Sequence, residues 1–190
     1  MNNSQIKIGS QIWMSSNLNV CHFRNGDIIN EAKTYKEWQE ADELSKPAWC
    51  YYENNSKYGG KLGKLYNWHA VNDARNLSPE NWDVPSDIDF EILSSFLGGS
   101  EMAGIKLKNS TDWKDNNQPK NSGFNALPGG ARLWSHKFCG LNENAFFWTS
   151  TEHNNYFSWH RVLINNYDTF GRVNQGGKGF GMSVRCIICN

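Results

Sequence analysis

The order of its local patterns constrains the fold of this chain more than any other feature. Two helical patterns lie before Ser110, and short β-like runs separated by Asn, Gly and Ser follow that residue. Regular alternation of strands and helices would predict a wound parallel sheet, whereas helices grouped ahead of strands favour an α+β architecture. We therefore predict an α+β fold with two main helices early and short twisted antiparallel strands with long loops late.

Both predicted helices have start and stop signals. Thr34 and Glu37 have the spacing of a capping box, at the start of a helix that ends near Leu44. Ser86 is a good N-cap for the second helix, and Gly98-Gly99 is a good end for it. The residues predicted to face the core are Tyr35, Trp38, Ala41 and Leu44 in the first helix and Ile88, Ile92, Leu93, Phe96 and Leu97 in the second.

The remaining segments read as strands, loops and short helical turns. Residues 5–20 resemble a hairpin broken at Gly9-Ser10, and residues 49–52 resemble a strand. We predict a loop over 58–64 and a short helix over 65–72. The later predicted strands are 126–127, 131–134, 146–150, 158–164, 171–174 and 181–189. The sequence contains no recognisable linker and no fixed-period repeat, so we predict one domain over residues 5–189.

Charge and hydropathy exclude several classes of partner. The chain has 19 basic and 19 acidic residues, so no cationic excess is present to bind nucleic acid. No stretch approaches the roughly 20 apolar residues of a membrane span. Met1–Gln5 lacks the basic head and apolar segment of a signal peptide. We predict neither a nucleic-acid partner nor a membrane span.

Aromatic content indicates recognition. Nine Trp and an aromatic fraction of 14% exceed what a core of this size needs. Large rigid rings are enriched where a surface binds a partner. Some of these rings are therefore expected at a binding face.

Cysteine usage leaves several possibilities open. The five cysteines include a pair, Cys186 and Cys189, at the end of a strand-like run. A redox pair is usually found at a helix N-terminus, and a zinc site needs a second ligand pair that is missing here. Residues three apart in an extended strand point in different directions, so we predict that these two thiols are not bridged.

Ordered sequence blocks give the chain a family resemblance. They begin with Ile8-Gly9-Ser10-Gln11-Ile12-Trp13-Met14, continue through Trp49, Gly63-Lys64-Leu65-Tyr66-Asn67-Trp68, Trp82 with Val84-Pro85-Ser86-Asp87, Ala126-Leu127-Pro128-Gly129-Gly130 and Trp148-Thr149-Ser150-Thr151-Glu152, and end with Gly181-Met182-Ser183-Val184-Arg185-Cys186. Together they resemble the Fibrobacter succinogenes major paralogous domain over nearly the whole chain. We assign the tryptophans inside these blocks to the core: Trp13, Trp49, Trp68, Trp82 and Trp148.

The resemblance implies a C-type-lectin-like fold and an extracellular or cell-surface location. The segment from Trp82 to Phe90 is also distantly similar to a block of the formylglycine-generating, sulfatase-modifying enzymes, which share that architecture. Those enzymes use a copper-binding cysteine pair shortly before their end, and no Cys lies between Phe146 and Arg185. The likeness therefore implies the fold and not the activity. A copper-dependent oxidase-like enzyme remains the catalytic alternative.

Other catalytic and metal motifs are weak. His22, His69, His136, His153 and His160 do not have the spacing of a metal-binding helix motif. Glu80-Asn81-Trp82-Asp83 is only a scrambled version of a calcium-lectin motif and lies at the start of the second helix. We predict no catalytic residue, no metal ligand and no cofactor. His153 and His160 are expected to be hydrogen bonders in surface loops.

A metal-independent binding face in the C-terminal half is the favoured hypothesis. Aromatic rings stack on sugar faces or on protein side chains, and amides pair with hydroxyls. The predicted partner is a glycan or a protein surface, and a structural tip or spacer of a surface assembly is a further alternative. The predicted ligand-binding residues are Trp134, His136, Trp159, His160, Asn165, Asn166, Tyr167, Asp168, Phe170, Arg172 and Asn174.

Overall fold

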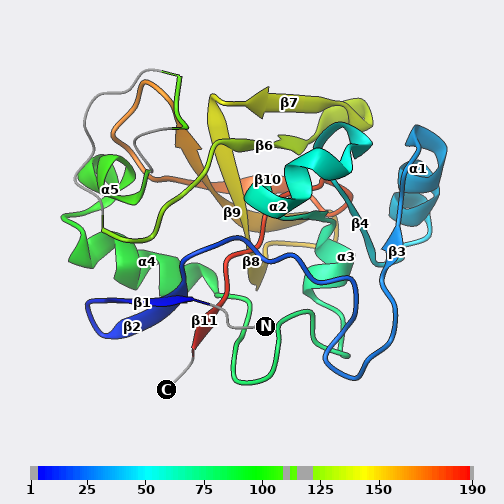
Figure 1. Cartoon of the computed structure of the whole chain (residues 1–190), viewed down its shortest axis with the longest axis horizontal. Helices are drawn as coiled ribbons and strands as arrows, with labels where there is room; N and C mark the ends of the chain where they lie inside the picture. The colour runs from blue at the N-terminus through cyan, green and yellow to red at the C-terminus, as the bar shows by residue number, and fades with distance from the viewer. Residues whose placement is uncertain (1–3, 109–111, 115–121, 189–190) are drawn as a thin grey trace.

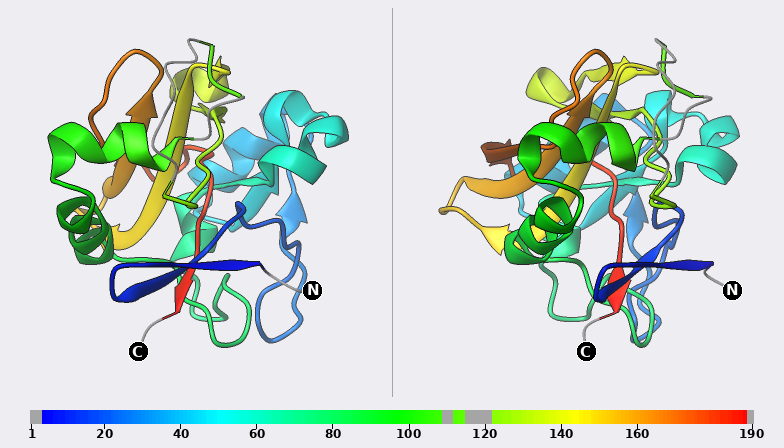
Figure 2. Two further views of the ribbon diagram at one scale, coloured as in Figure 1. Left: turned by 60° about the vertical axis from the view of Figure 1, so that its left-hand side comes forward. Right: turned by 90° about the vertical axis from the view of Figure 1, so that its left-hand side faces the viewer.

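A computed structural model describes residues 4–108, 112–114 and 122–188 of the chain. These residues fold into three sheets with helices on two sides, so the α+β class is confirmed (Figures 1 and 2). Helices α4 and α5 lie on one side of the largest sheet, and α1 to α3 with their small sheet lie on the other.

The largest sheet comes from the C-terminal half. Its strands have the order β10-β9-β8-β6-β7, and all neighbours are antiparallel except β6 and β8, which are parallel. The predicted all-antiparallel pairing is therefore wrong for that one pair. The strands are β6 Gly129–Arg132, β7 Phe138–Leu141, β8 Asn144–Glu152, β9 Phe157–Ile164 and β10 Gly171–Gly177.

Two small sheets use strands from the N-terminal half. In the first, the hairpin of β1 Gln5–Ile8 and β2 Gln11–Met14 pairs through β2 with β11 Ile187–Ile188, so the two ends of the chain lie close together (Figure 1). The hairpin turns at Gly9, whose φ of 62° suits glycine. The second contains β3 Asn30–Glu31, β4 Ala48–Cys50 and β5 Leu65–Tyr66.

The two main helices start where the capping residues predict. In α1 and α4, the side chains of Thr34 and Ser86 accept from the third backbone N–H of each helix, and Glu37 and Asp89 complete the capping boxes. The helices are α1 Tyr35–Glu43, α2 Gly59–Leu62, α3 Trp68–Val71, α4 Asp87–Phe96 and α5 Ser100–Leu107, with 3₁₀ turns η1 Tyr52–Asn54, η2 Ser56–Tyr58 and η3 Trp134–His136. Within the described part of the chain, no helix has the length and apolar character that crossing a membrane requires.

Three local predictions are wrong. Residues 58–64 are not a loop, because η2 and α2 occupy most of them. Residues 65–72 are split between β5 and α3, since Tyr66 N–H pairs with the carbonyl of Met182 instead of continuing a helix. Of the predicted strand over 181–189, only Ile187–Ile188 is a regular strand, and Gly181, Met182 and Ser183 form isolated bridges.

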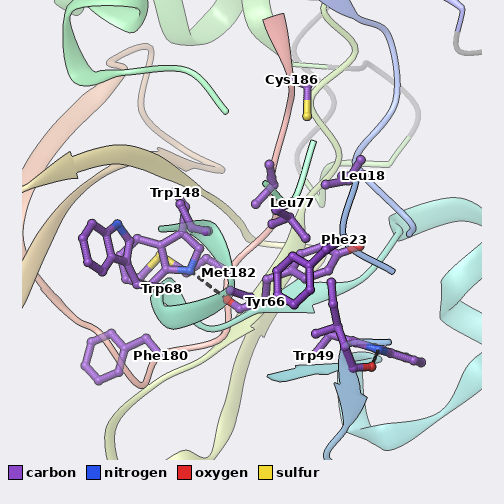
Figure 3. Packing of buried hydrophobic residues seen from close by; sticks show 14 of the residues in the cluster. Leu18, Phe23, Trp49, Tyr66, Trp68, Leu77, Trp148, Phe180, Met182 and Cys186 are labelled. Carbon is purple, nitrogen blue, oxygen red and sulfur yellow. Dashed lines mark hydrogen bonds between the residues drawn. The ribbon is translucent and has the colours of Figure 1, made fainter. Parts of the chain in front are cut away.

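The tryptophans of the sequence blocks form the core, as predicted. Trp13, Trp49, Trp68, Trp82 and Trp148 are all buried. Figure 3 shows Trp68 and Trp148 close to Met182, and Trp148 Nε1 donates to the carbonyl of Tyr66 at 2.8 Å. The indoles of Trp13, Trp49, Trp68 and Trp148 each combine a large apolar surface with an Nε1–H hydrogen bond that fixes the orientation of the ring.

The predicted core face of helix α4 is confirmed for Leu93 and Leu97, which are buried together with Phe90. It is wrong for Ile88 and Phe96, which are 70% and 63% exposed, and for Ile92, which is also exposed. Both rows have helical spacing, so periodicity alone did not distinguish them. Buried Asp87 selects the face, because it pairs with Arg161 under the helix. In α1, Trp38 and Ala41 are buried as predicted, but Tyr35 and the C-cap Leu44 are exposed.

Three arginines are almost fully buried: Arg132, Arg161 and Arg185. Arg132 donates to the carbonyls of His136 and Thr34 and stacks on Trp38. Hydrogen bonds from a buried guanidinium offset part of the cost of burying its charge, although Arg132 Nη1 and Arg161 Nε have no partner among the described residues. Through the bonds that they do make, these side chains link distant segments of the chain.

Candidate functional site

A pocket of about 480 Å³ lies where segments from both halves of the chain meet. Its walls come from α1 and the residue after its C-cap, from α3, from η3, from the β8–β9 turn and from the segment after β10. The residues that matter most for its chemistry are Asp42, His69, His136, Asn155, Tyr156 and Lys178.

Two histidines on the pocket wall have incompletely paired rings. His69 Nε2 and His136 Nδ1 are buried, and neither has a hydrogen-bond partner among the described residues. His69 Nε2 lies 3.9 Å from Asp42 Oδ1, which is beyond hydrogen-bond distance. Burial lowers the pKa of His136, so its imidazole is neutral near neutral pH and its unprotonated nitrogen is an acceptor. Buried polar atoms without partners are rare and are typical of functional sites.

Backbone geometry around the pocket is unusual. Ser45, Ser135 and His136 line it with positive φ values of 51°, 54° and 53°. Non-glycine residues adopt this left-handed region at a cost, and such residues gather at binding and catalytic sites. Arg132 Nε donates to the carbonyl of His136 at 2.9 Å, and Tyr35 contacts the imidazole edge-on, so His136 is held from two sides.

Tyr156 is the aromatic side chain at the mouth of the pocket. It is 77% exposed, although its backbone is fixed. Asn154 Oδ1 accepts from the backbone N–H groups of Tyr156 and Phe157, and the Tyr156 carbonyl accepts from the N–H of Lys178. A ring on a rigid turn is well suited to stack on a ligand.

The charged side chains that line the pocket, Lys178 and Asp42, differ in how fully they are paired. Lys178 pairs closely with Glu152, and its ammonium lies 4.9 Å from the ring centroid of Trp68. The Asp42 carboxylate, in contrast, receives no hydrogen bond from the described residues and packs against Gly179, where an added Cβ would collide with it. Only a glycine at position 179 leaves room for this carboxylate.

Of the residues predicted to bind ligand, His136 lines the pocket. Trp134 is adjacent in sequence, but its side chain lies outside the described part of the structure. The β9–β10 loop contains Asn165, Asn166, Tyr167 and Asp168. Lys108 Nζ fixes this loop by donating hydrogen bonds to the carbonyls of Ile164, Asn165 and Tyr167. This loop belongs to a different surface.

A second group of predicted residues does come together on strands β9 and β10. The Arg172 guanidinium lies 3.7 Å from the ring centroid of half-buried Trp159, and His153 contacts the same ring edge-on. Asn174 lies 3.3 Å from His153. Since Arg172 already stacks on Trp159 and is held there by Asp87, one face of the indole is taken. About 16 Å of strand separates Trp159 from the loop at Ile164.

Two of the predicted ligand-binding residues are in the interior. Phe170 is fully buried beside Phe90 in the core under α4, and so cannot line a surface patch. His160 lies within strand β9, not in a surface loop, and packs edge-on against Trp148. Burial lowers the pKa of His160 to about 4, so it is neutral. Alternation along β9 places both Ser158 and His160 on the inner face and Trp159 outside.

The sequence analysis missed Asp42, Tyr156 and Lys178, and it gave His69 no role. Their positions span more than one hundred residues of sequence, and no spacing rule joins them. The one local signal is Asn154-Asn155 before Tyr156, a turn pattern that presents the next side chain to solvent.

Cysteines do not contribute to the pocket. Cys21, Cys50, Cys139 and Cys186 are unbridged, and Cys189 lies outside the described residues, so the prediction about the Cys186–Cys189 pair stays a prediction. Burial raises the pKa of Cys50 to about 12 and also raises that of Cys186. Cys21 Sγ lies 3.1 Å from His22 Nδ1, and neither residue lines the pocket. Within residues 4–108, 112–114 and 122–188, no group of three or more His, Cys, Asp or Glu side chains is arranged to hold a metal ion.

Comparison with known proteins gives one match. No curated protein and no solved structure matches the chain significantly. The family model of the Fibrobacter succinogenes major domain matches residues 6–187, almost the whole chain, which confirms the resemblance of the sequence blocks. The chain therefore belongs to the Fibrobacter succinogenes major domain family.

Proposed function

We propose that this chain is a non-catalytic binding module of C-type-lectin-like fold that takes a carbohydrate in the pocket between α1, α3, η3 and the β8–β9 turn. The observation that carries the proposal is the pair of buried ring nitrogens on the pocket wall, His69 Nε2 and His136 Nδ1, which lack partners among the described residues. Ligand hydroxyls are groups of the right size and chemistry to pair with them.

The other features of the pocket favour a sugar as the ligand rather than a flat protein surface. A volume of about 480 Å³ suits a ligand of one to a few rings and is large for a single protein side chain. Asp42 and Asn155 add polar groups, and exposed Tyr156 adds a ring that can stack on the apolar face of a sugar. The copper-oxidase alternative receives no comparable support, because Cys50 and Cys186 are buried thiols with raised pKa values.

Replacing Tyr156 by Ala is expected to weaken glycan binding about 10-fold or more, because an anchor ring at the pocket mouth is lost. The matched control is Tyr167→Ala. Tyr167 is also exposed, at 59%, but lies on the β9–β10 loop outside the pocket. A broad glycan array would identify ligands, and isothermal titration calorimetry would compare the two variants. Weakened binding in Tyr167→Ala with unchanged binding in Tyr156→Ala would move the site to the β9–β10 loop and contradict the proposal.

A second candidate function, a structural unit of an assembly, is favoured by one observation. Ile88, Ile92 and Phe96 form an exposed apolar stripe on α4 at spacings of four residues. Contiguous exposed apolar groups on a helix are typical of interfaces. In the simplest form, two copies pair through this stripe about a two-fold axis.

Replacing Ile92 by Lys tests that candidate. If the stripe is an interface between copies, sedimentation velocity at rising concentration should show dimers of the wild type and about 10-fold weaker dimerisation of Ile92→Lys, since a charge enters the apolar contact. Ile28→Lys is the control, because Ile28 is the same residue type and is more exposed than Ile92, at 71% against 46%, but lies outside α4. A wild type that stays monomeric, or an equal effect of both variants, would remove this candidate.

A further inference from the structure

The carboxylate of Asp42 is the pocket group whose hydrogen-bonding role is fixed: it only accepts. Asp42 presents this carboxylate without a donor among the described residues. Burial lowers the pKa of His136, so its imidazole is neutral and adds no positive charge to the wall. A ligand that fits must therefore present donors.

The charged side chains that line the pocket also differ in whether they can pair with a ligand. Lys178 is the cation of its lining, and it is neutralised by Glu152 and lies over the ring of Trp68. Its side chain is only 15% exposed, so it is poorly placed to reach an anionic ligand. The carboxylate of Asp42, 38% exposed, lies 3.9 Å from His69 Nε2 and forms no ion pair with a lysine or arginine among the described residues.

From these features we infer that the pocket selects a cationic amino sugar over neutral and acidic sugars. The inference rests on the proposed function and names the ligand class for the same pocket. In this arrangement the ammonium of the sugar pairs with the Asp42 carboxylate, and ring hydroxyls, which can donate or accept, pair with His69 Nε2 and His136 Nδ1. The exposed ring of Tyr156 offers both a stacking surface and cation–π attraction.

Acidic sugars are disfavoured by the Asp42 carboxylate. A carboxylate or sulfate in the pocket would face Asp42 with a like charge. Neutral sugars lose only the ion pair. The expected order of affinity is therefore amino sugar, then neutral sugar, then acidic sugar.

Calorimetry with three matched probes tests this order. Trimers of glucosamine, N-acetylglucosamine and galacturonate are titrated into the full chain at about pH 7, where the amine is largely protonated. The glucosamine trimer is expected to bind about 10-fold more tightly than the N-acetylglucosamine trimer. In about 0.5 M NaCl this preference should be smaller, because Asp42 is partly exposed and salt screens its charge.

The variant Asp42→Asn identifies the responsible group. It keeps the shape and one acceptor oxygen but removes the charge, so binding of the glucosamine trimer should fall about 10-fold while binding of the N-acetylglucosamine trimer stays within about 2-fold. Glu43→Gln is the control, since Glu43 is the next residue of α1 and does not line the pocket. Equal melting temperatures of both variants and the wild type establish that folding is unchanged.

The outcomes separate the two proposals. Binding of all three trimers with equal affinity, tighter binding of galacturonate, or an unchanged preference in Asp42→Asn overturns the inference and leaves a carbohydrate pocket in place. Loss of the preference in Glu43→Gln also overturns it, because the responsible charge would then lie outside the pocket. No saccharide binding by the array or by calorimetry overturns both the inference and the proposed function.

Discussion

Replacing Arg185 by Met is expected to lower the free energy of unfolding by about 3–5 kcal/mol, because several buried acceptors lose their donors together. Arg185 is fully buried and forms no ion pair with a carboxylate among the described residues. Its guanidinium donates to Asn17 Oδ1 at 2.7 and 3.2 Å, to the carbonyl of Met14 at 3.1 Å and to the carbonyl of Phe124. Burial lowers its pKa to about 9, which still leaves it charged at neutral pH.

The conservative variant Arg185→Lys sharpens this prediction. An ammonium has three donors around one atom and cannot span acceptors that lie on both edges of a planar guanidinium. Arg185→Lys should therefore recover little of the lost stability. Urea denaturation of the three proteins gives the comparison, and a loss below about 1 kcal/mol for Arg185→Met would show that the hydrogen bonds to Asn17 and Phe124 contribute little net stability.

The parts of the fold that were predictable are those with local causes. Thr34 and Ser86 start helices because a hydroxyl caps a backbone N–H three residues away, and Gly9 turns a hairpin because glycine tolerates positive φ. The face of α4 was predictable only in part. Leu93 and Leu97 were expected inside and are buried, but Ile88, Ile92 and Phe96 were expected there too, and the choice between the two rows depends on where Arg161 of β9 meets Asp87.

The pocket could not be predicted from local sequence patterns, for a similar reason. Asp42, His69, His136 and Tyr156 come from four separate segments, which only the sheet and the buried arginines bring together. Aromatic density in the C-terminal half did indicate that rings there have a role, but it did not distinguish interior rings such as Phe170 from exposed ones such as Tyr156. Burial depends on strand register, which the sequence pattern of a short strand fixes poorly.

One arginine links the interior to the pocket. Arg132 is buried against Trp38 and holds the carbonyl of His136, so the position of one pocket histidine depends on the packing of α1 on β6. Asp42 lies on the same helix α1, one turn after Trp38. The pocket is thus built on the core, and its geometry should be rigid in the absence of ligand.

Removing the carboxylate of Asp87 is expected to cost about 3–5 kcal/mol of unfolding free energy, because it leaves the buried charge of Arg161 without its main partner. Asp87 is 6% exposed, and its two oxygens lie 2.7 Å from Arg161 and from Arg172. The Arg161 side chain is 1% exposed, so solvent cannot replace the lost acceptor.

Glu91 supplies a matched control for Asp87→Ala, since both acids contact Arg161 Nη2 at nearly equal distances, 2.7 and 2.8 Å. Glu91 is 50% exposed, so Glu91→Ala should cost only about 0–1 kcal/mol. In the double variant Asp87→Ala with Arg161→Met, the unpaired charge is gone, and part of the stability lost in Asp87→Ala should return. Urea unfolding measures all four proteins. Equal losses for Asp87→Ala and Glu91→Ala would mean that burial does not decide the strength of these pairs, and that the face of α4 is set by its apolar contacts alone.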